Sequence, residues 1–166
     1  RLDIRQESSR HSQLLYEFIK KKYRADYYKW SEKQRINFLS KHLKTNKKII
    51  KNFRFKNREN LEVWSTFKIL ADQPEECLGA YIISMTSSAS DILAVSFLQK
   101  EANINKRLRV VPLFETLNDL KNAKSIMENL FSLSWYRKLN KNNHEIMIGY
   151  SDSSKDAGKL SASWHQ

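Results

Sequence analysis

The feature that most constrains the fold is the alternation of strand-like and helix-like segments in residues 77–166. Three short apolar runs are separated by longer stretches that carry apolar residues at helical spacing; the runs are CLGAYIISM, LRVVPLFE and HEIMIGYSD. Near-continuous apolar runs are typical of strands that are covered on both faces of a parallel sheet. Strands that alternate with helices favour a parallel sheet or an α/β barrel. One piece of such a barrel is the simplest account.

The chain of 166 residues is long enough for one domain with a core and too short for two. Within this single piece the sequence patterns distinguish three parts. Residues 1–19 predict one strand and a helix. Residues 20–76 predict a basic helical insertion, and residues 77–166 predict three strand–helix units, with a last helix in SKDAGKLSASW. We expect the barrel piece to be incomplete at both ends.

Two local signals refine the predicted helices. Ser31 and Gln34 have the spacing of a capping box, which favours a helix that begins after Ser31. The long helical stretch TLNDLKNAKSIMENLFSLSWYRKLN is expected to break near residues 132–134, where serines interrupt it. Trp135 and Tyr136, which follow the break, are interpreted as packing residues.

The net charge of +12 is concentrated in residues 20–58, which hold 15 Lys or Arg against two acids. Aromatic residues are interleaved with these charges: Tyr23, Tyr27, Tyr28, Trp30, Phe38, Phe53 and Phe55. Such a mixture could bind single-stranded nucleic acid by stacking rings on bases. It could instead be surface composition, since the chain is rich in Lys, Asn and Ile together. We favour the second interpretation and do not expect nucleic acid as a partner.

Other features of the sequence bear on the cellular location of the protein and on whether it spans a membrane. Cys77 is the single cysteine, so an internal disulfide is excluded and a reducing, cytoplasmic location is expected, with Cys77 buried. The sequence has no run of about 18 apolar residues that would predict a membrane span. It begins without an initiator methionine or a signal-peptide core, so we expect it to be part of something longer.

Charged side chains follow the predicted strands at their carboxyl ends, where parallel α/β folds collect their functional groups. Arg5, Glu115 and Asp152 each end a predicted strand, and Lys155 lies just beyond Asp152. Two carboxylates without a neighbouring His or Cys suit Mg²⁺ or Mn²⁺ better than zinc. Arg5 offers a planar fork for a phosphate or carboxylate, and Lys155 offers a mobile positive charge. The pattern predicts a site for an anionic, phosphorylated substrate held by a metal.

Each of these residues also has a purely structural interpretation. Glu115 with Thr116 could form a strand-to-helix turn, and Asp152 with Ser153 could cap a helix. Arg5 could pair with Asp3, its nearest acid in the sequence. These alternatives stay open on the sequence alone.

The motifs that carry these residues resemble the phosphoenolpyruvate carboxylase family over almost the whole chain, least in residues 20–58. The similar segments are LDIRQESSRH, AYIISM, SDILAV, VVPLFETLNDL, LFSLSWYR and MIGYSDSSKDAG. The last is the family's long and specific signature. The resemblance implies α/β architecture: part of a parallel, TIM-like barrel with extra helices, mostly helical overall.

The resemblance also implies an activity. Enzymes of this family carboxylate phosphoenolpyruvate with bicarbonate to oxaloacetate and phosphate, through carboxyphosphate and a metal-stabilised enolate, and are usually homotetramers. Carried over by motif, Glu115 and Asp152 resemble the ligands of Mg²⁺ or Mn²⁺. Arg5 resembles the arginine that holds the substrate phosphate, and Lys155 resembles the active lysine of the signature.

Two family motifs have no counterpart in the sequence: the upstream HPTE-type motif with its catalytic histidine and the downstream GRGG loop. We therefore expect an internal fragment that is inactive and poorly folded alone, because an open half-barrel leaves sheet edges uncovered. Two alternative functions remain: another Mg²⁺-dependent barrel enzyme acting on phosphoenolpyruvate or pyruvate, and a basic nucleic-acid-binding module.

Overall fold

The computed structural model describes residues 2–105, 107–140 and 143–165. Its described part contains a sheet of four parallel strands in the order β1-β2-β3-β4, so each strand lies beside its neighbour in the sequence. The strands are β1 (Leu2–Glu7), β2 (Leu78–Ser84), β3 (Arg109–Phe114) and β4 (Met147–Ile148). The predicted parallel α/β architecture is confirmed as a mostly helical fold around a parallel sheet.

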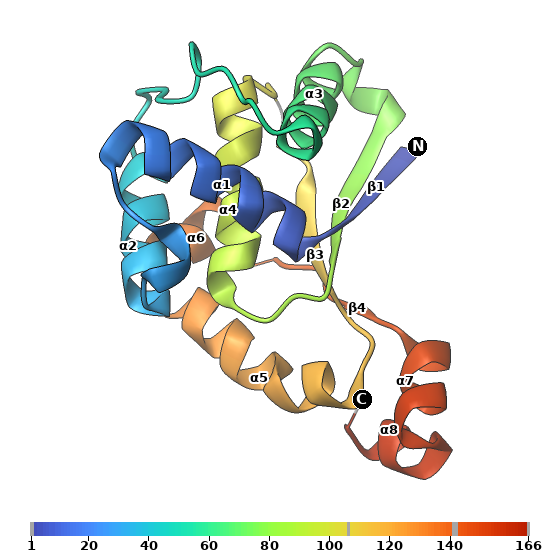
Figure 1. Cartoon of the computed structure of the whole chain (residues 1–166). Helices are drawn as coiled ribbons and strands as arrows, with labels where there is room; N and C mark the ends of the chain where they lie inside the picture. Colours follow the sequence, from blue (N-terminus) through green and yellow to red (C-terminus); the bar gives the residue numbers. More distant parts are fainter. Residues whose placement is uncertain (1, 106, 141–142, 166) are drawn as a thin grey trace.

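Most helices gather on one side of this sheet, and α7 and α8 lie beyond the end of β4 (Figure 1). The helices are α1 (Ser8–Tyr23), α2 (Glu32–Leu43), α3 (Arg58–Ala71), α4 (Ala89–Ala102), α5 (Leu117–Phe131), α6 (Ser134–Leu139), α7 (Tyr150–Ala157) and α8 (Lys159–His165), with short 3₁₀ turns η1 (Tyr27–Lys29) and η2 (Glu75–Cys77). The predicted capping box of Ser31 and Gln34 is present. The predicted break between α5 and α6 is also confirmed.

The two faces of the sheet carry separate apolar clusters, because successive side chains of a strand point to opposite faces. On β2, Tyr81 and Ile83 belong to the main core with the helices. Ala80 and Ile82 instead join Val111 and Leu113 of β3 in a second cluster. We call the face that carries this second cluster the inner face.

Helix α4 is the centre of the main core, and all of its residues are buried. It contacts α1, α2, α3, α5 and β3. A helix surrounded in this way needs apolar residues on every side, which explains why its sequence shows no polar face. Its polar residues near the carboxyl end, Lys100 and Glu101, are therefore buried with it.

Five of the seven aromatic residues of the basic segment pack into or against the core, while Tyr23 and Tyr28 are exposed. Tyr27 and Phe55 are buried in the core. Trp30, Phe38 and Phe53 are partly buried and pack against the same core. Base stacking needs exposed ring faces, so this packing leaves two of the seven rings, Tyr23 and Tyr28, exposed for it.

The prediction for Cys77 is wrong, because the residue is exposed. It ends the turn η2 just before β2 rather than lying inside the strand. Tyr136 is buried and Trp135 packs against the core, as predicted. None of the helices in the described ranges combines the length and the apolar character that a membrane span requires.

Because of His11 in α1, we expect the free energy of unfolding to depend on pH. It is fully buried, and its Nε2 lies 2.8 Å from the Tyr81 hydroxyl. Burial, with a smaller contribution from Arg10, lowers the pKa of His11 to about 3. The unfolded chain takes up this proton near pH 6.5 and the folded chain does not, so His11 destabilises the fold as pH falls from about 6.5 toward 3.

We therefore expect the His11→Gln variant to lose stability less steeply than the parent between pH 7 and pH 5. The His11 contribution at pH 5 amounts to about 2 kcal/mol for a 1.5-unit interval. Urea unfolding of the full-length parent and the full-length variant at pH 7, 6 and 5 measures the difference between the two slopes. Parallel slopes for parent and variant would show that His11 is not the titrating group.

Candidate functional site

Arg5 and Glu115 meet at the carboxyl edge of the sheet. The Arg5 guanidinium donates a hydrogen bond of 2.9 Å from Nη2 to Oε2 of Glu115, although 110 residues separate them. Arg5 pairs in register with Ile82, a member of the inner-face cluster, and Glu115 directly follows β3. The ion pair therefore bridges β1 and β3 on the inner face, across β2. The alternative pairing of Arg5 with Asp3 does not occur, since Asp3 accepts a hydrogen bond from the Ala80 amide.

The turn that carries Glu115 is held by its neighbours. Thr116 caps α5 in a capping box with Asp119, whose carboxylate also accepts from the Glu115 amide at 3.3 Å. The side chain of Glu115 takes no part in this cap. The strand-to-helix turn weighed as an alternative is thus present, and it leaves the Glu115 carboxylate available to a partner.

Asp152 and Lys155 form a second pair on α7. Strand β4 ends at Ile148 and α7 begins at Tyr150, so the predicted strand HEIMIGYSD is shorter than expected. Asp152 consequently lies in the first turn of a helix, exposed, rather than at a strand end. Lys155 Nζ lies 3.9 Å from Asp152 Oδ1. The cap of α7 is at Gly149, so the interpretation of Asp152 as a capping residue is wrong.

Gly149 brings the signature segment against Glu115. Its amide donates a hydrogen bond of 2.9 Å to the Phe114 carbonyl. A Cβ atom at this position would lie 2.6 Å from Glu115 Cβ, closer than side chains allow, so only glycine fits. The second glycine, Gly158, has φ +78° and ends α7, a backbone conformation that glycine adopts without strain.

Asp156 is a residue of this region that the sequence reasoning missed. Its Oδ2 accepts a hydrogen bond of 2.8 Å from the Leu117 amide at the start of α5. This contact joins α7 to the turn that carries Glu115. Its partner is 39 residues away in the sequence, and no local spacing signals such a contact.

The four predicted site residues are thus arranged as two ion pairs, Arg5–Glu115 and Asp152–Lys155. Gly149 and Asp156 anchor the second pair beside the first. Among the described residues, no hydrogen bond or ion pair links one pair directly to the other. The structure therefore brings Arg5 to Glu115 and Lys155 to Asp152. Glu115 directly follows β3, and Asp152 lies in the helix that follows the neighbouring strand β4.

The donor set fits a hard divalent cation. Within the ranges that the structure describes, no group of three or more His, Cys, Asp or Glu residues is placed to hold a metal. Glu115 and Asp152 offer two carboxylates, each engaged in its own ion pair. Such oxygen donors, with no His or Cys beside them, are of the kind that Mg²⁺ or Mn²⁺ prefers.

Comparison with known proteins agrees with these motifs. The family model described as phosphoenolpyruvate carboxylase matches residues 1–166. Phosphoenolpyruvate carboxylase of Aliivibrio salmonicida is 49% identical over 166 residues, which are 100% of this chain and 19% of that protein. C4 phosphoenolpyruvate carboxylase of Flaveria trinervia is 48% identical over 164 residues, 99% of this chain and 17% of that protein. The chain spans about a fifth of the length of these relatives, and it belongs to the phosphoenolpyruvate carboxylase family.

Proposed function

We propose that the protein to which this chain contributes carboxylates phosphoenolpyruvate with bicarbonate, giving oxaloacetate and phosphate. The observation that carries the proposal is the meeting of Arg5 with Glu115 beside a signature segment that Gly149 anchors to the same turn. A guanidinium and a carboxylate at the edge of a parallel sheet, with a second carboxylate on the helix that follows β4, suit a phosphorylated, metal-bound substrate. Family membership supports the same reaction.

Arg5 would bind the phosphate of the substrate. In the structure its guanidinium is engaged with Glu115, so an arriving phosphate would compete for the same donors. When Arg5 turns to the phosphate, the Glu115 carboxylate becomes free for a cation. Substrate binding and cation binding would therefore support each other through this one side chain.

Lys155 would act as a mobile positive charge toward bicarbonate or the transferred phosphoryl group. Its long stem is exposed on α7, and its distance of 3.9 Å from Asp152 leaves it loosely held. Glu115 and Asp152 would hold Mg²⁺ or Mn²⁺. Such an ion, when bound, supplies a Lewis acid for the negative charge that develops on the substrate oxygen.

We also propose that the four-stranded sheet is part of a closed parallel barrel, with residues 1–166 as one piece of it. The inner-face cluster supports this, because a barrel interior is filled by side chains from alternate positions of its strands. The sequential strand order is the order of such a barrel. The division into residues 1–19, 20–76 and 77–166, a homotetrameric assembly and a cytoplasmic location are further proposals from the sequence.

The reaction can be tested on the full-length protein by coupling oxaloacetate to NADH oxidation with malate dehydrogenase. We expect activity that needs phosphoenolpyruvate, bicarbonate and a divalent cation together, that stops with EDTA, and that returns with Mg²⁺ or Mn²⁺. Bicarbonate-free, degassed buffer is the control. Conversion of phosphoenolpyruvate to pyruvate without bicarbonate would instead support another enzyme of phosphoenolpyruvate or pyruvate.

A further inference from the structure

Ser84 places a hydroxyl at the carboxyl edge of the inner face of the sheet. It is the last residue of β2 and still pairs in register with Glu7 of β1. Because side chains alternate along a strand, Ser84 lies on the same face as Ala80 and Ile82 of the inner-face cluster. It is therefore the polar end of an otherwise apolar row on β2.

The register of the sheet places Ser84 between Arg5 and Glu115. Arg5 pairs with Ile82, which pairs with Val111 of β3, so these three residues form one level of the sheet. Ser84 is two residues beyond Ile82, and Glu115 is four residues beyond Val111. The side chain of Ser84 thus lies on the middle strand, halfway in register between the levels of Arg5 and Glu115. The Arg5 guanidinium crosses the end of β2 to reach the Glu115 carboxylate, so it passes the position of Ser84.

The Ser84 hydroxyl takes no part in holding the fold around it. Ser84 is partly buried, and among the residues that the structure describes its hydroxyl has no hydrogen-bond partner. Two nearby hydroxyls have a structural role instead: Ser8 Oγ donates to the Met85 carbonyl at 2.7 Å, and Thr86 Oγ1 donates to the Ile83 carbonyl at 2.9 Å. These two bonds hold the turn that follows β2. The hydroxyl of Ser84 is left as a donor for a ligand.

The turn that follows Ser84 is fixed in an unusual conformation. Met85 has φ +54°, in the left-handed region that residues with a Cβ atom seldom adopt. Such a conformation persists where the surroundings determine it, and it is found most often at functional sites. The hydrogen bonds from Ser8 and Thr86 hold it here. The backbone at Ser84 is therefore in place before a ligand arrives, which lowers the entropy that binding costs.

We propose that Ser84 is a further substrate-binding residue, whose hydroxyl donates a hydrogen bond to the phosphate that Arg5 binds. Arg5 and Glu115 lie on either side of β2, so an anion that replaces Glu115 on the guanidinium lies over the end of β2. One guanidinium leaves acceptor positions of a phosphate unfilled, and a neutral hydroxyl adds a donor without adding charge. This inference rests on the proposed carboxylation of phosphoenolpyruvate and adds a residue to the same site.

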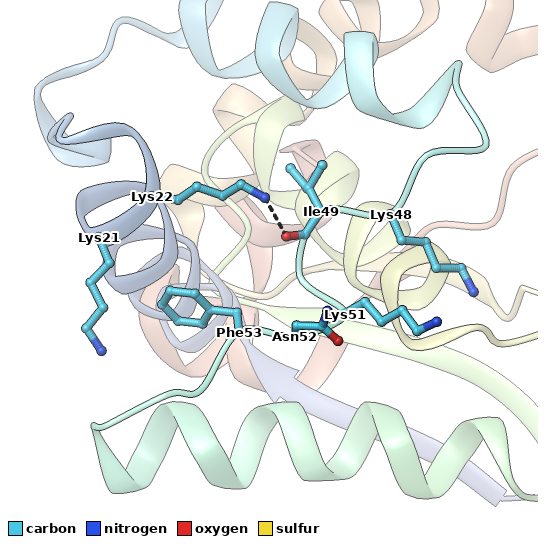
Figure 2. Close-up of a pocket in the computed structure, with 7 residues that line it drawn as sticks. All are labelled: Lys21, Lys22, Lys48, Ile49, Lys51, Asn52 and Phe53. Atoms are coloured by element: carbon cyan, nitrogen blue, oxygen red, sulfur yellow. Dashed lines mark hydrogen bonds between the residues drawn. The ribbon is translucent and has the colours of Figure 1, made fainter.

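The lysines of the basic segment do not form a comparable anion site, although several of them line a cavity of about 460 Å³. Figure 2 shows Lys21 pointing to one side, while Lys48 and Lys51 extend to the opposite side. Lys22 donates to the Ile49 carbonyl at 2.7 Å. Charges that diverge in this way do not share a ligand, whereas the two donors at the carboxyl edge of the sheet lie on one face of adjacent strands.

The contact can be measured without turnover by titrating 2-phosphoglycolate into the full-length protein by calorimetry, with Mg²⁺ present and bicarbonate absent. This probe has a phosphate and a carboxylate but no enol that could react. We expect Ser84→Ala to raise its Kd at least about tenfold, the scale for one hydrogen bond to a charged group. Ser84→Cys keeps the size of the side chain but is a weak donor, so it should bind as weakly. The matched control is Ser65→Ala, which removes a half-buried hydroxyl of α3 and should change Kd less than twofold.

Oxalate, which has two carboxylates and no phosphate, tests which group of the substrate the Ser84 hydroxyl meets. Its Kd should change less than twofold in Ser84→Ala. Equal weakening of oxalate and 2-phosphoglycolate would overturn the phosphate contact, and so would a Ser84→Cys variant that binds 2-phosphoglycolate like the parent. Urea unfolding should give the same free energy for the parent and Ser84→Ala. A marked loss of stability with an unchanged Kd would show that the hydroxyl is structural.

Failure of this inference and failure of the proposed function give different results. If the parent forms oxaloacetate in the malate dehydrogenase assay while Ser84→Ala keeps both its Kd for 2-phosphoglycolate and its KM for phosphoenolpyruvate, the reaction stands and the Ser84 contact is wrong. If no oxaloacetate forms but Ser84→Ala still weakens 2-phosphoglycolate and not oxalate, carboxylation is wrong and the phosphate contact stands.

Discussion

The Asp152→Asn variant of the full-length protein is expected to lose metal-dependent oxaloacetate formation, with kcat/KM lowered by at least about 10²–10³-fold, the scale for removal of one group that stabilises developing charge. Asparagine keeps the size of the side chain and one oxygen, but it removes the charge that a divalent cation needs. Asp152 is exposed in the first turn of α7, so the substitution should leave the fold intact. The malate dehydrogenase assay at several Mg²⁺ concentrations separates weaker metal binding from slower turnover.

Asp72→Asn is the matched control for this variant. Asp72 is an exposed residue just after α3 and lies far in the sequence from the signature segment. Its replacement makes the same chemical change and should leave both activity and metal dependence as in the parent. Carboxylation by the Asp152 variant with unchanged metal dependence would remove Asp152 from the metal site.

The sequence predicted the local elements well, because their signals are local. The capping box at Ser31 depends on residues three apart, and the break after Phe131 depends on adjacent residues. Strand β4 was predicted too long. Its apolar run continues beyond the sheet, but only Met147 and Ile148 pair with β3, and the close approach of Gly149 to Glu115 turns the chain into α7.

The candidate site could be predicted only as a set of residues at one edge of the sheet. The rule that function lies at the carboxyl ends of parallel strands selected Arg5 and Glu115, and the structure joins them. It could not predict the Asp156 contact with Leu117, which depends on long-range packing. The sequence also could not say which aromatic residues of the basic segment are covered, since periodicity does not show which neighbour covers a helix; Tyr27 and Phe55 are buried and Tyr28 is exposed.

Glu101 is a buried carboxylate on which one whole loop depends. Its side chain is fully buried at the end of α4, next to Lys100, whose ammonium lies 3.4 Å from Glu101 Oε1. The carboxylate also accepts from the amides of Ile49 and Ile50. Removal of the carboxylate would therefore leave two buried N–H groups without an acceptor and one buried ammonium without its counter-charge.

The Glu101→Ala substitution is accordingly expected to lower the free energy of unfolding by about 3–5 kcal/mol, which is the range for removing one partner of a buried ion pair. Glu128→Ala is the control, because Glu128 is also a helical glutamate paired with a lysine, but its pair with Lys124, one helical turn away, is exposed and 3.9 Å long. That variant should lose less than about 0.5 kcal/mol. Urea unfolding gives the two free energies, and hydrogen exchange at the Ile49 and Ile50 amides should accelerate only in the Glu101 variant. Similar small losses in both variants, with those amides still protected, would show that the loop is held by its apolar contacts rather than by Glu101.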